Sequence, residues 1–266
     1  MRWLAGLGSV ATIAFLASLG AQPVLAYQGQ RGSGAVSVQP DRVRHPLAAG
    51  RSALRAAMRA VPLLAPTAEA VLGRHAIDGW TFGAKTFVTP SRYGVQLIWT
   101  NKAVPVNALV LSLPPDSSEA DNFGAFSGTR YASIRAAIHV LPLHLGYFFE
   151  APPKGVRPGF VTLEPALKAL VYSGPFGMVE WGQDGWTFQV NQTADVSLAR
   201  QVARYVSRHP LPTGHNGMVV VAHAGDGNHS YVAWRVGRVV STASNYHHAR
   251  SAVGMADSMA AVSTTR

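Results

Sequence analysis

The stretch 178–210 constrains the fold more than any other part of the chain, because a hairpin signal and a helix signal follow one another in it. Two aromatic, alternating runs, Met178–Trp181 and Trp186–Val190, flank a short turn that contains Asp184-Gly185. Asp-Gly between alternating apolar runs is a strong local signal for a two-residue hairpin turn. We therefore expect two antiparallel strands at this point.

A helix is expected directly after this hairpin. Asp195 or Ser197 can cap its N-terminus, and Pro210 ends it. Its apolar residues recur at the spacing of one helix face: Leu198, Val202, Tyr205 and Val206. Hairpin and helix would share one core.

The end of the chain repeats this order of strands and helix. The segments that read as strands are Met218–Ala222, Ser230–Val236 and Val239–Thr242. A helix from about Tyr246 to Val262 would follow them. In each unit a Trp, Trp181 or Trp234, is expected to pack beneath the helix that returns across the sheet.

The first half of the chain also carries strand signals. Four aromatic or β-branched segments read as short strands: Gly79–Phe82, Lys85–Val88, Tyr93–Trp99 and Ala108–Leu113. A polar loop, Pro114–Thr129, and a helix, Arg130–Val140, come after them. In that helix Ile134, Ala137 and Ile138 provide the apolar residues.

The sequence therefore predicts the α+β class, with antiparallel sheets, helices packed on one face, and two similar lobes. We expect an N-terminal lobe over 47–150 and a C-terminal lobe over 151–266, with their boundary in the Pro-rich segment Ala151–Gly159. The pentapeptide Asp78–Phe82 recurs unchanged as Asp184–Phe188, which suggests a duplication.

Residues 1–26 have the pattern of a secretory signal peptide, and 27–46 the composition of a flexible leader. An apolar run, Leu4–Leu19, precedes small residues that end at Ala26, the expected cleavage point. We thus predict an extracytoplasmic protein, with an uncleaved N-terminal membrane anchor as the alternative. No second apolar run approaches spanning length, so the mature chain is expected to have no transmembrane span.

The chain is basic, with a net charge of +10 and 19 Arg among its 23 basic residues, which indicates anionic partners. Arg residues recur every fourth position on two expected helices, where they could bind anionic polymer or lipid: Arg51, Arg55 and Arg59, then Arg200, Arg204 and Arg208. Only Tyr205 interleaves an aromatic ring with these residues, so a nucleic-acid groove is not favoured.

A second candidate site comes from the histidines, six of which lie after residue 208. His223 and His229 flank an expected hairpin loop that contains Asp226, so imidazole and carboxylate could bind a divalent metal such as zinc or copper. The chain has no Cys, which excludes disulfides and thiolate metal sites. No other cofactor is expected.

The C-terminal part, Gly177–Met259, resembles the extracytoplasmic modules of bacterial anti-sigma-factor and lipoprotein-sorting-like proteins. The resemblance rests on the Trp181–Trp186 hairpin, the Trp234 hairpin with Gly237, and the closing segment Ala256–Met259. It implies a curved sheet that presents a surface or a lipid-sized hollow, and generally no enzymatic activity.

Sequence signals for catalysis are weak. The chain contains no Gly-x-Ser-x-Gly elbow and no His-Glu-x-x-His helix. We therefore predict an exported, soluble, non-catalytic binding or envelope-associated protein, with the Arg-lined helices as its contact to an anionic polymer or lipid. The alternative is a His-rich metal-binding protein or a metal-dependent enzyme outside the cytoplasm.

Overall fold

The computed structural model describes residues 61, 64–67, 80–112, 120–212, 216–224 and 227–261. These residues belong to one compact unit, Pro40–Arg266. Four predictions lie outside the described residues: the signal peptide, the leader, the helix that carries Arg51, Arg55 and Arg59, and the metal ligand Asp226.

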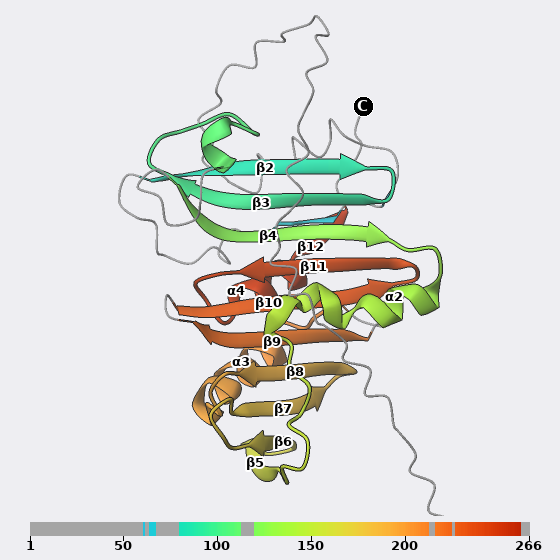
Figure 1. Ribbon diagram of the computed structural model, residues 1–266, viewed down its shortest axis with the longest axis vertical. Coiled ribbons are helices and arrows are strands. Elements are labelled where there is room, and N and C mark those ends of the chain that lie inside the picture. The colour runs from blue at the N-terminus through green and yellow to red at the C-terminus, as the bar shows by residue number, and fades with distance from the viewer. Residues whose placement is uncertain are drawn as a thin grey trace, which may run out of the picture. The chain divides into compact units, whose positions relative to one another are not determined.

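A ten-stranded sheet dominates the described part of the chain, in the order β2-β3-β4-β11-β10-β9-β8-β7-β6-β5 (Figure 1). Its strands are β2 (Thr81–Thr89), β3 (Arg92–Thr100), β4 (Ala120–Arg130), β5 (Gly159–Glu164), β6 (Leu167–Tyr172), β7 (Met178–Gln183), β8 (Trp186–Asn191), β9 (Gly217–Ala224), β10 (Gly227–Val236) and β11 (Val239–Asn245). Neighbours are antiparallel except for β8 and β9, which are parallel. Two further strands, β1 (Leu64–Pro66) and β12 (Met259–Ala261), form a separate pair.

Short helices lie on both faces of this sheet. They are the 3-10 helices η2 (Leu109–Ser112) and η3 (Pro142–Phe148) and the α-helices α2 (Ile134–Val140), α3 (Val196–Arg208) and α4 (Ser251–Asp257). Figure 1 shows α2 in front of the sheet and α3 and α4 behind it. We call the two sides of the sheet the α2 face and the α3 face.

The central strands are buried on both faces because their side chains alternate between two cores. In β9, Val219 and Val221 pack in the larger core with α3 and α4. Val220 and Ala222 pack in a second core with α2 and η3, whose buried residues include Leu145. An uninterrupted apolar run is typical of a strand that is covered on both sides.

The predicted fold class was wrong. Strands make up about half of the described residues, and the helices are short, so the protein is mainly β rather than a balanced α+β. Helices do not pack on one face only, because the Val-rich central strands require cover on both. Two similar lobes are not found either, since β4 of the first half pairs along its length with β11 of the second.

The hairpin predicted around Asp184-Gly185 and the helix predicted directly after it are confirmed. Strands β7 and β8 are joined by Asp184 and Gly185, whose φ values of 51° and 80° suit the left-handed turn. The Asp195 carboxylate accepts a hydrogen bond from the Leu198 N–H (2.9 Å) and caps α3. Trp181 and Trp234 are buried in the larger core, as expected.

Strand β4 was missed because glycine and polar residues replace the usual β-formers in it. The segment was expected to be a polar loop, yet its residues from Ala120 onward form a central strand. At Gly128 a Cβ atom would lie 2.3 Å from the Tyr93 ring, so only glycine leaves room for that ring. The glycine content that made this segment resemble a loop therefore allows close packing of β4 against Tyr93.

Two other apolar segments differ from expectation. Ala108–Leu113 was expected to be a strand, but Leu109–Ser112 forms η2, with Leu111 buried and Leu109 91% exposed. A short apolar run does not by itself distinguish strand from helix. The closing helix is also shorter than expected, because Asn245 accepts hydrogen bonds from the His247 and His248 N–H groups before α4 begins.

Polar contacts occupy backbone groups at both edges of the sheet. At the β2 edge, the Asn107 N–H donates to the Ala84 carbonyl (3.0 Å) and the Asn107 side-chain oxygen accepts from the Thr86 N–H (2.7 Å). At the β5 edge, the Arg200 guanidinium donates to the Thr162 carbonyl (3.1 and 3.3 Å). Backbone groups that are occupied in this way are not free to pair with a strand of another molecule.

Replacing Asn107 by glycine should open the β2 edge. Asn107 has a φ of 64°, which glycine adopts freely, so the variant removes only the side-chain acceptor. We expect a loss of about 1 kcal/mol in urea unfolding and faster aggregation by light scattering. Asn107→Asp keeps an acceptor oxygen and serves as the control; equal aggregation of Asn107→Gly and wild type would contradict this role.

Trp234→Ala should destabilise the protein by about 3–5 kcal/mol, because it leaves a cavity in the larger core. The side chain is 1% exposed. Val236→Ala, on the same strand but 44% exposed, should be nearly neutral in the same denaturation measurement. Similar losses for both variants would show that cavity formation is not the cause.

Candidate functional site

The structure does not bring His223 and His229 together. His223 pairs with Asn228 across the β9–β10 hairpin, whereas His229 pairs with Ala222, the next position along. Adjacent strand positions point to opposite faces, so the two rings leave opposite sides of the sheet. A single ion cannot contact both.

Each of the two rings has other neighbours. Nδ1 of His223 lies 3.1 Å from the side-chain oxygen of Asn228, and the His229 ring contacts the rings of Tyr231 and Tyr246. Asp226 lies outside the described residues. Among the described residues, no group of three or more His, Asp or Glu side chains is placed to hold a metal ion.

Two Arg residues of α3 contact strand β5 rather than forming an open ridge. Arg200 donates to the Thr162 carbonyl, and Arg204 forms an ion pair with Glu164 (2.7 Å). Arg208 lies in the last turn of the helix. Of the six predicted anion-binding Arg residues, three lie on α3, and two of these already contact acceptors of the protein.

A different surface combines apolar and basic side chains, and it lies on α2 and η3. Ala137 and Leu141 of this segment point into the core, while Ile134, Ile138 and Leu143 are exposed by 51%, 53% and 68%. We call these three exposed residues the apolar ridge. Large exposed apolar side chains that are grouped on one short segment indicate a contact surface.

Three exposed Arg residues lie around the beginning of α2: Arg92, Arg135 and Arg238. We call them the basic rim. Arg92 begins β3 on the α2 face, Arg135 belongs to α2, and Arg238, in the β10–β11 turn, donates to the carbonyl of Ala132, just ahead of the helix. Arg130 pairs with Val239 of the larger core, so its side chain leaves the sheet on the α3 face. The sequence contains no acidic residue from 122 to 149, so no carboxylate of this segment offsets their charge.

A hydrogen bond ties the two ends of the α2–η3 segment together. Oη of Tyr131, ahead of α2, lies 2.6 Å from Nε2 of His144 in η3. Burial lowers the pKa of His144, and the nearby Arg92 charge lowers it further. Burial raises the pKa of Tyr131, against a smaller opposing effect of Arg92. Both groups therefore remain neutral around pH 7.

The helix predicted over Arg130–Val140 is present as α2, although it begins only at Ile134. Of its three apolar residues Ile134, Ala137 and Ile138, only Ala137 faces the sheet. An apolar helix stripe is normally buried, so the pattern alone favours the core. The missing acidic residues over 122–149 were the signal that could have indicated this surface.

No helix among the described residues combines the length and hydrophobicity needed to cross a bilayer. The three residues of the apolar ridge belong to two consecutive elements, α2 and η3.

Acidification should loosen the α2–η3 segment. Because the folded pKa of His144 lies below its ordinary value of 6.5, the unfolded chain binds the proton more readily. The stability due to neutral His144 is complete above about pH 6.5 and decreases as the pH falls through that value. His144→Phe should flatten this part of the pH–stability curve in thermal unfolding; an unchanged slope would contradict the assignment. His139→Phe, at an exposed position, is the control.

Comparisons with known proteins found no relative of this chain. No family model, no curated protein and no solved structure matches it. The resemblance to anti-sigma-factor and lipoprotein-sorting-like modules stays a prediction.

Proposed function

We propose that the chain is an exported, non-catalytic binding protein that docks on anionic lipid surfaces through the apolar ridge and the basic rim. The observation that carries the proposal is the exposure of Ile134, Ile138 and Leu143 beside three Arg residues. Export rests on the signal-peptide pattern of residues 1–26.

Lipid fits this surface better than a purely polar anion. A polyanion would contact the Arg residues but would leave the apolar ridge in water. An anionic bilayer provides phosphate for the guanidinium groups and an acyl boundary into which short apolar side chains insert. The proposal keeps the predicted class of partner but moves the contact from α3 to α2 and η3.

The expected strength follows from the number of groups involved. Moving three already half-exposed side chains out of water contributes about 1 kcal/mol each, since full burial is worth about 1.5–3 kcal/mol. Each Arg near an anionic surface adds about 1 kcal/mol. The total of about 6 kcal/mol corresponds to a dissociation constant of about 40 µM. Docking should therefore be reversible and salt-dependent.

Vesicle co-sedimentation tests this function. Wild-type protein without residues 1–26 should bind vesicles that contain phosphatidylglycerol and should bind pure phosphatidylcholine at least tenfold less tightly. The double variant Ile138→Gln/Leu143→Gln should weaken binding to anionic vesicles about tenfold. Arg135→Gln/Arg238→Gln should weaken it similarly and reduce its salt dependence.

Matched controls lie outside the surface. Phe176→Gln removes an equally exposed apolar group, and Arg157→Gln an exposed charge; both should bind as wild type does. Equal losses in test and control variants would contradict the proposal. A change of the ridge variants in monomer–dimer equilibrium without any change in vesicle binding would instead identify a second copy of the chain as the partner.

A further inference from the structure

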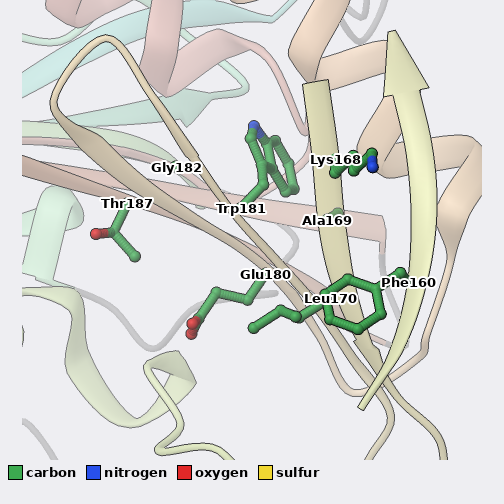
Figure 2. A pocket seen from close by; sticks show the side chains of 8 residues that line it. All are labelled: Phe160, Lys168, Ala169, Leu170, Glu180, Trp181, Gly182 and Thr187. Carbon is green, nitrogen blue, oxygen red and sulfur yellow. The ribbon is translucent and has the colours of Figure 1, made fainter. Parts of the chain in front are cut away.

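An open pocket of about 270 Å³ lies over strands β5 to β8, at the other end of the sheet from the basic rim (Figure 2). Phe160, Leu170 and Glu180 are cross-strand neighbours and form a row along one wall. The row continues through Gln189 to Val220, so it belongs to the α2 face. Neither the histidines nor the Arg residues discussed above line this pocket.

The Glu180 carboxylate is held in place by its cross-strand neighbour on β8. Gln189, which is 2% exposed, donates a hydrogen bond to Oε2 of Glu180 (2.8 Å) and another to the Glu150 carbonyl (3.0 Å). A buried amide with two fixed acceptors cannot rotate freely. The carboxylate is therefore oriented before any ligand arrives, which lowers the entropy cost of binding.

A charge of the opposite sign lines the same pocket. Lys168 is exposed, and no ion pair joins it to Glu180 in the described part of the chain. Phe160 is 76% exposed and presents an aromatic ring beside Leu170. The pocket thus combines a carboxylate, an ammonium group and an apolar wall.

We infer that this pocket binds a small zwitterion, whose ammonium group contacts Glu180 and whose phosphate or carboxylate contacts Lys168, with Leu170 and Phe160 as the apolar wall (Figure 2). A simple cation would leave Lys168 without an opposite charge, and a simple anion would leave Glu180 without one. Charge-assisted hydrogen bonds are the interactions that recognise such a ligand. The small volume restricts the ligand to a head group or a free compound of that size.

Gly182 offers a way to fill the pocket without disturbing the fold. A Cβ atom at Gly182 would meet nothing nearer than the Trp186 carbonyl at 3.8 Å, so a larger side chain projects into open space. Gly159, on β5, is similarly open, with its nearest neighbour at 3.9 Å, and it does not line the pocket. Gly182→Val and Gly159→Val are therefore a test variant and a matched control.

The test is calorimetric titration of the chain without residues 1–26 with O-phosphoethanolamine, inorganic phosphate and ethanolamine. We expect saturable binding of phosphoethanolamine and at least tenfold weaker binding of the other two. Gly182→Val should abolish binding, and Glu180→Gln and Lys168→Gln should each weaken it about tenfold. Gly159→Val should bind as wild type does. Thermal unfolding of each variant shows whether its fold is kept.

Several outcomes would overturn the inference: no saturable binding at millimolar phosphoethanolamine, equal binding of phosphate alone, or full binding by Gly182→Val. Competition by phosphatidylethanolamine vesicles supports the site and identifies a lipid head group as the source, whereas saturable binding of the free compound without such competition supports a soluble ligand. The inference does not depend on membrane docking, because the probe is soluble and the pocket variants leave the ridge and rim intact.

Discussion

The pairing of β4 with β11 is the contact on which the sheet depends. Strands that are more than a hundred residues apart in the chain form seven cross-strand pairs, from Val239 opposite Arg130 to Asn245 opposite Gly124. A side-chain hydrogen bond between Ser127 and Thr242 (2.7 Å) reinforces the pairing. Without this pairing β2–β4 and β5–β11 would be two separate sheets, each with an open edge.

Burial on both faces follows from that single sheet. Because the central strands have neighbours on both sides, their alternating side chains require cover above and below, which α3 and α4 give on one face and α2 and η3 on the other. The remaining edges are occupied by Asn107 and Arg200, whose polar groups contact the outermost strands. Arg200 thus serves the fold at a position where the charge pattern suggested ligand binding.

The candidate surface is a consequence of this architecture. Two Arg residues of the basic rim lie at the start of β3 and in the β10–β11 turn, which the strand order β3-β4-β11-β10 brings to the same end of the sheet. The α2 helix follows β4 at this end of the sheet. Its small residue Ala137 packs on the sheet, so Ile134 and Ile138 are exposed. These residues are scattered over the sequence, so spacing along the chain could not group them.

The sequence by itself determined the local elements: the Asp184-Gly185 hairpin, the Asp195 cap of α3, and the burial of Trp181 and Trp234. These depend on turn geometry, capping and alternation, which act over a few residues. Only the tertiary structure decided the strand order, the two-sided cover of the sheet and the separation of His223 from His229. The reason is physical: a one-residue difference in register changes the face of a side chain, and the pairing of distant strands is chosen by burial across the whole sheet.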